Sequence, residues 1–246
     1  MIRMFIKHTC TIEMILLFGQ AVSATTAPDN LWQKAVAIAG NNVRWIPGVI
    51  MMTSEEFDKH DRVQKTEEAV TRLSLGENGM ILSETTAMKD GKKVASQKKT
   101  SVQEETGKDS GNIGVSVRLG QEDFFMPERQ ATVSATPTGQ RKTIDDVICV
   151  EYVFTQQKSP KEKLSGSAWL DETSGAPVEV AFTTIPLPKH VKQMASVIHY
   201  HSSPDAWYPI RMQMEASGGF LLIQKHVRIR LEMNDYWQAP KKMLEK

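Results

Sequence analysis

Hydrophobic and polar residues alternate with a period of two through most of the chain after residue 48. Such alternation is typical of strands with one dry and one wet face in an antiparallel sheet. It predicts strands over residues 49–58, 62–75, 80–88, 92–103, 113–119, 141–144, 147–154, 163–171, 177–185, 193–202, 207–215 and 220–233. Gly, Asp, Asn and Ser predict turns between strands at residues 59–61, 76–79, 90–91, 145–146, 172–176 and 217–219.

The apolar face is clearest in the last two predicted strands. Its expected members are Ile210, Met212, Met214, Val227, Ile229, Leu231 and Met233. Methionine is flexible and polarizable, so this face suits the wall of a cavity that binds an apolar ligand. The same pattern also fits an ordinary sheet core that packs against a helix, and the sequence leaves both interpretations open.

One helix is predicted ahead of the strands. Pro28 and Asp29 form a start signal, an apolar stripe follows at helical spacing, and Gly40 ends the segment. The chain contains neither an internal repeat nor a linker-like stretch. We therefore expect an α+β fold of mostly antiparallel strands, with residues 25–246 as a single domain.

Residues 1–24 show the order of features that export signals have. Arg3 and Lys7 make a basic start, an apolar run covers 12–21, and Val22–Ala24 offers small residues for cleavage after Ala24. The run is shorter than the roughly 20 apolar residues of a membrane span. The sequence therefore predicts a signal peptide and a periplasmic mature chain that has no transmembrane segment.

A polar stretch interrupts the strands between residues 104 and 123. It is rich in Gly and charged residues and predicts a mobile loop. Phe124, Phe125 and Met126 follow it directly. They either anchor this loop to the core or form a flap over a pocket.

A local motif near the C-terminus is distinctive. One strand ends in Gly166–Asp171, a turn passes through Thr173 and Gly175, the next strand starts at Pro177, and further strands end in Asn234–Trp237. This arrangement resembles the LolA/LolB-like superfamily of exported bacterial proteins, which includes outer-membrane lipoprotein-sorting carriers and RseB-type proteins. The resemblance implies a strongly curved open sheet, an unclosed β-barrel, with a helix on its concave side.

The same resemblance implies a function. Carriers of this family hold acyl chains, so we expect a non-enzymatic binding protein with a concave apolar cavity for a lipid, an acyl chain or a lipidated protein, in outer-membrane lipoprotein trafficking. The alternative is an envelope protein-interaction or stress-sensing module of the RseB type. The expected partners are lipid or lipoprotein acyl chains and envelope proteins.

Net charge and cysteine count bear on the partners and on the thiol chemistry of the chain. The chain has 30 basic and 29 acidic side chains, and two of the basic and one of the acidic residues lie within 1–24. The mature chain is therefore neutral, and nothing in this balance favours nucleic acid. After cleavage Cys149 is the only cysteine, so an internal disulfide is excluded. Its apolar neighbours favour a buried structural residue, with a reactive thiol or a dimer link as the alternatives.

Few residues suggest catalysis or metal binding. The sequence has no nucleophile elbow, zinc-protease motif, phosphate-binding loop or dinucleotide-binding glycine pattern, so we expect neither an enzyme nor a cofactor. His199 and His201 are two residues apart on one predicted strand, with Asp205 nearby. Two histidines on one face are usable metal ligands, but ordinary solvated strand residues are the simpler interpretation, and no metal site is predicted.

Overall fold

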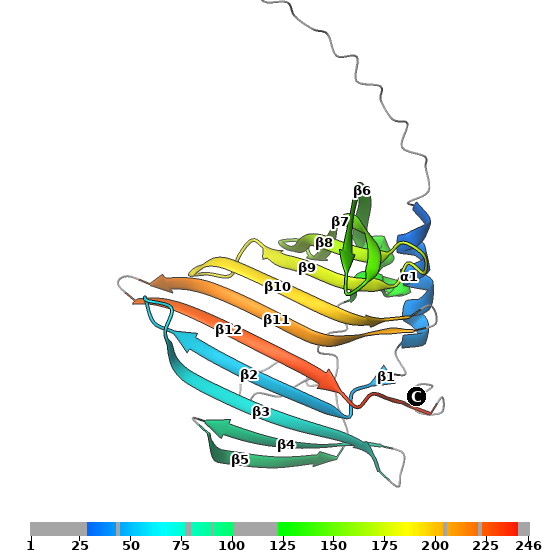
Figure 1. Ribbon diagram of the computed structural model, residues 1–246. Coiled ribbons are helices and arrows are strands. Elements are labelled where there is room, and N and C mark those ends of the chain that lie inside the picture. Colours follow the sequence, from blue (N-terminus) through cyan, green and yellow to red (C-terminus); the bar gives the residue numbers. More distant parts are fainter. Residues whose placement is uncertain are drawn as a thin grey trace, which may run out of the picture.

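The computed structural model describes residues 29–42, 45–76, 80–89, 91–100, 123–203, 206–220 and 223–240. The predicted signal peptide at 1–24 and the predicted short strand at 113–119 lie outside these residues. Most of the described chain forms one antiparallel sheet of eleven strands with the order β5-β4-β3-β2-β12-β11-β10-β9-β8-β7-β6 (Figure 1). Within this sheet, neighbouring strands follow one another in the sequence, except that β2 pairs with β12.

The strands of this sheet are long, and most begin and end close to the predicted positions. Their bounds are β2 Val49–Phe57, β3 Val63–Leu75, β4 Ile81–Lys89, β5 Lys92–Thr100, β6 Val133–Ile144, β7 Val147–Ser159, β8 Glu162–Asp171, β9 Pro177–Ile185, β10 Val191–Ser202, β11 Trp207–Phe220 and β12 Ile223–Asn234. A second, two-stranded sheet pairs β1 (Trp45–Ile46) with β13 (Trp237–Gln238). The prediction of a mostly antiparallel fold with one unclosed sheet is confirmed.

The helix lies across the strands at one end of the sheet (Figure 1). α1 (Asp29–Asn42) contacts β11, β8 and β6, which are the sixth, ninth and eleventh strands across the sheet. Neighbouring strands lie about 4.8 Å apart, and a helix of 14 residues is about 21 Å long, so one helix spans this half of the sheet. α1 packs on the inner side of the sheet, where its apolar residues join the buried side chains of β7 to β10.

Two short 3-10 helices complete the layer on the concave side. η1 (Asp123–Phe125) and η2 (Pro127–Thr132) both contact α1. Trp32 of α1 packs its ring against Phe125, Tyr152 and Phe154, with ring centroids 4.6, 5.9 and 5.8 Å apart. This aromatic cluster is the main core of the molecule. None of the helices in the described part of the chain is both long enough and apolar enough to cross a membrane.

Two predicted boundaries are wrong for different reasons. The turn predicted at 217–219 is part of β11, because Gly218 pairs with both Val191 and Lys225. A Cβ atom on Gly218 would lie 2.1 Å from the carbonyl oxygen of His190, so glycine is needed there to let two backbones meet. The strand predicted at 141–144 begins earlier, at Val133, since β6 pairs along most of β7.

Candidate functional site: an apolar wall on the concave face

The pairing register places an apolar surface on the face of the sheet that carries α1. In one row across the strands, Met212 lies beside Leu231 and Leu231 beside Met52. The next rows contain the pairs Met214 and Ile229, Ala216 and Val227, and Met233 and Ile50. We call this surface the apolar wall and define it by Met52, Met212, Met214, Val227, Ile229, Leu231 and Met233. Six of the seven residues predicted to line a cavity therefore lie together.

Burial changes along the wall. Met233 and Leu231 are buried, with exposed fractions of 1% and 5%, and they belong to a small core cluster with Ile50. Met52, Met214 and Ile229 are only half-buried. The wall is thus packed at the end near α1 and partly open farther along the strands. It combines the two interpretations that the sequence left open, a core at one end and accessible apolar surface at the other.

The open end of the wall becomes polar. On β2 the same face continues from Met52 to Ser54 and Glu56, which lies beside Val227. Lys225 forms an ion pair with Glu56 over 2.7 Å, and this hydrogen-bonded contact lowers the pKa of the Glu56 carboxyl. An occupant of the wall would therefore meet apolar side chains first and an ion pair at the far end. That gradient matches a molecule with an apolar chain and a polar group.

Ile210 does not belong to the wall, contrary to the prediction. The register between β10 and β11 shifts so that His199 pairs with Arg211 while Tyr200 pairs with Pro209, which leaves Ile210 as the extra residue of a β-bulge. A bulge reverses the simple alternation of faces. Ile210 is 36% exposed and lies next to the exposed Arg211.

The segment predicted as anchor or flap lies in the core. Phe124 and Phe125 have exposed fractions of 0% and 1%. Phe124 packs its ring on Phe154 and Phe182, with centroids 4.7 and 5.1 Å apart. Met126 is half-buried and packs against the same cluster. The structure thus supports the anchor interpretation for the two phenylalanines, and the loop that precedes them is outside the described residues.

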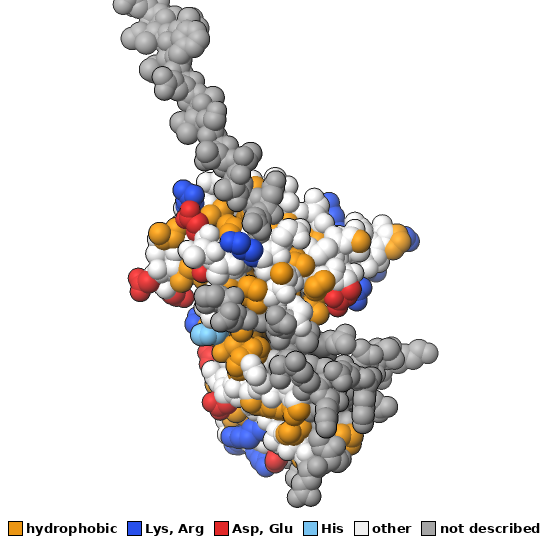
Figure 2. All heavy atoms as spheres, turned by 90° about the vertical axis from the view of Figure 1, so that its right-hand side faces the viewer, with side chains coloured by type: hydrophobic (Ala, Val, Ile, Leu, Met, Phe, Trp, Pro, Cys, Tyr) orange, Lys and Arg blue, Asp and Glu red, His pale blue; other side chains and the backbone are white. Residues whose placement is uncertain are grey.

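The hydrophobic surface is visible from the side of the molecule on which α1 lies. Figure 2 shows hydrophobic side chains at the surface around the helix and also across the lower part of the molecule.

The opposite face of the sheet carries ion pairs. Arg228 contacts Glu215 at 2.6 Å and Glu55 at 3.7 Å, and Arg230 contacts Glu55 at 2.9 Å. Arg228 also lies over the ring of Phe57, 5.0 Å from its centroid. The acidic and basic side chains of this row satisfy one another, so the row stabilises the sheet surface without offering a free charge.

The histidines considered as metal ligands have other contacts. His199 lies 3.8 Å from a carboxylate oxygen of Glu179, and His201 stacks on Tyr208 with centroids 4.9 Å apart. Within the described residues, three or more His, Cys, Asp or Glu side chains nowhere come together as metal ligands. Asp205 lies outside the described residues.

Comparisons with known proteins concern the fold. No protein-family model matches the chain, and no curated protein matches it. Among solved structures, it resembles a putative outer membrane lipoprotein-sorting protein domain from Vibrio parahaemolyticus, with 12% identity, a TM-score of 0.36, and coverage of 85% of this chain and 94% of that one. It also resembles a LolA superfamily protein from Nitrosomonas europaea, with 12% identity, a TM-score of 0.32, and coverage of 89% and 97%.

A third resemblance is to a chain in the complex structure of Pseudomonas aeruginosa MucA/MucB, with 6% identity, a TM-score of 0.23, and coverage of 86% of this chain and 98% of that one. These are the kinds of protein that the sequence motif resembles. At these identities and TM-scores the likeness carries no conclusion about family, ligand or partner, for which the residues of this chain are the only basis.

Proposed function

We propose that the protein is an exported, non-enzymatic binding protein that holds an apolar chain, such as an acyl chain of a lipid or lipoprotein, against the apolar wall. The observation that carries this proposal is the half-buried part of the wall, where Met52, Met214 and Ile229 lie on the concave face. Flexible methionines adapt to chains of different shape, and apolar contact area gives affinity without a fixed geometry.

The direction of the wall supports an amphiphilic occupant. Its apolar rows end at the ion pair of Glu56 and Lys225. An acyl chain on the wall would leave its polar end near these charges, where water and an ion pair can solvate it. The periplasm, reached through the predicted signal peptide, is the compartment in which such a carrier would meet lipids and lipoproteins of the envelope.

Two neighbouring methionines of β2 provide a matched test. Met52 lies on the wall, whereas Met51 pairs with Val70 and Glu232 on the opposite face and is 37% exposed. We expect Met52→Gln to weaken binding of a fluorescent fatty acid about tenfold, because the amide would face the apolar chain without a partner. Met51→Gln should bind the probe as the unchanged protein does. Equal binding by both variants would contradict the proposal.

A direct measurement identifies the natural occupant. Native mass spectrometry of the protein purified from its own envelope should show a bound species that denaturation releases and that solvent extraction recovers as a lipid. A bare polypeptide mass, together with no uptake of the fluorescent fatty acid, would favour the alternative role as a module that binds envelope proteins.

A further inference from the structure

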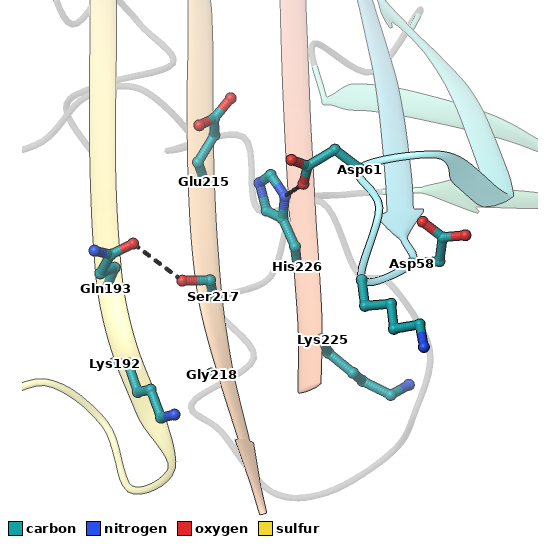
Figure 3. Close-up of a pocket in the computed structure, with 10 residues that line it drawn as sticks. Asp58, Asp61, Lys192, Gln193, Glu215, Ser217, Gly218, Lys225 and His226 are labelled. Carbon is teal, nitrogen blue, oxygen red and sulfur yellow. Dashed lines mark hydrogen bonds and ion pairs between the residues drawn. The ribbon is translucent and has the colours of Figure 1, made fainter. Parts of the chain in front are cut away.

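A polar pocket of about 390 Å³ lies at one end of the sheet. Three parts of the chain form it: the turn between β2 and β3, the start of β10, and the adjacent ends of β11 and β12 (Figure 3). Gln193 pairs with Ser217, and Ser217 with His226, whereas the neighbouring row of Ala216 and Val227 belongs to the wall side. Gln193, Ser217 and His226 therefore line the pocket from the face opposite to the wall. Lys225, whose ion pair with Glu56 lies at the end of the wall, also lines the pocket, so the two sites are neighbours with different linings.

The carboxylates of the pocket are already engaged. Asp58 accepts hydrogen bonds from the backbone N–H groups of His60 and Arg62 and forms an ion pair with the Arg62 side chain at 2.7 Å. These contacts lower the pKa of Asp58 to about 2, chiefly through the backbone hydrogen bond from Arg62. Glu215 forms an ion pair with Arg228 at 2.6 Å, and Arg228 itself does not line the pocket.

The third carboxylate faces the only histidine of the pocket. Asp61 lies 3.3 Å from Nδ1 of His226, so this nitrogen carries the proton that the carboxylate oxygen accepts. The ring of His226 also stacks on Phe57, with centroids 4.7 Å apart. This contact fixes the turn of β2 and β3 against β12. All three acidic side chains of the lining thus have cationic or hydrogen-bonding partners.

The ammonium groups of the pocket are less well compensated. Lys225 pairs with Glu56, but its side chain is 59% exposed. Lys59 and Lys192 are exposed, and neither has an ion pair with any residue that the structure describes. Figure 3 shows Lys192 and Lys225 extending toward the same end of the pocket, beyond Ser217. The pocket consequently contains ammonium groups without a carboxylate partner among the described residues, whereas each of its carboxylates has a partner.

We propose that this pocket binds a compact oxyanion, a phosphate group, with Lys59 and Lys192 as the principal charged contacts. A phosphate carries several acceptor oxygens, and hydrogen bonds from ammonium groups to it are among the stronger ones in proteins. A neutral apolar ligand would gain little here, and a cation would meet the lysines. The ligand chemistry is therefore an oxyanion, whether free in solution or part of a lipid headgroup.

Backbone contacts around the pocket fix the position of β10 relative to β11. Gly218 lets β11 approach the start of β10, because a Cβ atom there would lie 2.1 Å from the carbonyl oxygen of His190. The N–H of Gly219 donates to the same oxygen over 2.9 Å. This contact joins the segment that carries Lys192 to β11, so the lysine has a defined position relative to Ser217.

Titration with inorganic phosphate tests the proposal. At low ionic strength, amide resonances of Ser217 and His226 should shift in a saturable manner in the purified protein. The double variant K59Q/K192Q should weaken this binding about tenfold. The control K161Q/K163Q removes the same charge from the turn before β8 and from the start of β8, outside the pocket lining, and should bind phosphate as the unchanged protein does. Absence of saturable binding, or equal weakening in both variants, would overturn the proposal.

A second arm identifies the source of the phosphate. If the site serves a lipid headgroup, vesicles of phosphatidylglycerol should bind the protein and K59Q/K192Q should reduce this binding; if it serves a soluble ion, only inorganic phosphate should bind. Both results support the site, and failure of both probes refutes it. The acyl-probe assay separates this site from the wall, because K59Q/K192Q should leave fatty-acid uptake unchanged.

Discussion

Cys149 shows at the scale of one residue how burial changes chemistry. Its side chain has an exposed fraction of 0%, and its thiol donates to the carbonyl oxygen of Val147 over 3.4 Å. Burial, followed by the negative charge of Asp171, raises the pKa of the thiol to about 11. Since the thiolate is the reactive form, this cysteine is a structural residue at neutral pH. The prediction of a small buried apolar residue is confirmed.

A thiol reagent should therefore react slowly with Cys149 in the folded protein. We expect little labelling by iodoacetamide near pH 7 and rapid labelling after unfolding in denaturant. The folded state binds the thiol proton more tightly than the unfolded state does. The stabilisation that this pKa shift gives is therefore complete below about pH 9 and is lost as the pH rises toward 11. Mass spectrometry after timed labelling measures this. Fast labelling of the native protein at pH 7 would contradict it.

At the scale of elements, the turn between β8 and β9 holds α1 against the sheet. Asp171 accepts hydrogen bonds from the N–H of Thr173 and from the hydroxyl of Ser174, at 2.8 and 2.6 Å. Lys34 of α1 donates to the carbonyl oxygen of Thr173 over 3.2 Å. Gly175 follows with a φ of 79°. The residues that carried the family resemblance thus form a docking point for the helix.

Gly175 and Gly139 make a matched pair for testing this docking point. Both have a φ of 79°, but a Cβ atom on Gly175 would lie 2.7 Å from the carbonyl oxygen of Leu31, whereas nothing lies within 4 Å at Gly139. Gly139→Ala should cost about 1–2 kcal/mol for the left-handed backbone alone. Gly175→Ala should cost about 1–3 kcal/mol more because the helix must shift. Urea unfolding measures both, and equal losses would show that the helix contact does not matter.

At the scale of the whole molecule, two core clusters share one continuous sheet. The larger cluster contains α1, Phe124 and the inner side chains of β7 to β10, and the smaller contains Ile50 and Met233. Met212 packs against both. Because β11 and β12 also pair along most of their length, we expect the two halves of the sheet to unfold together.

Substitution of Phe124 tests this cooperativity. Phe124→Ala should lower the free energy of unfolding by about 3–5 kcal/mol, since the side chain is fully buried among aromatic rings. Val153→Ala, at a side chain that is 46% exposed, should change it by less than about 0.5 kcal/mol. Tryptophan fluorescence and far-ultraviolet circular dichroism should report the same midpoint. Two separate transitions would show that the clusters are independent.

Much of the fold could be predicted because local rules govern it. Alternation of apolar and polar residues located most strands, and Asp145–Asp146 marked a hairpin turn in which both residues have positive φ, as a two-residue turn requires. The rule that glycines mark turns failed at Gly218, where the chain stays extended because a neighbouring backbone approaches it. A local pattern cannot show which backbone lies opposite.

The candidate sites, too, could be predicted from the sequence only in part. By itself the sequence determined which residues are apolar and at what period, and this located six of the seven expected wall residues. Only the tertiary structure decided that Ile210 is displaced by a bulge and that Met52 joins the wall from another strand. It alone also brought Lys59 and Lys192 to one pocket. The physical reason is that register and proximity depend on hydrogen bonds between strands far apart in the chain, which no local pattern encodes.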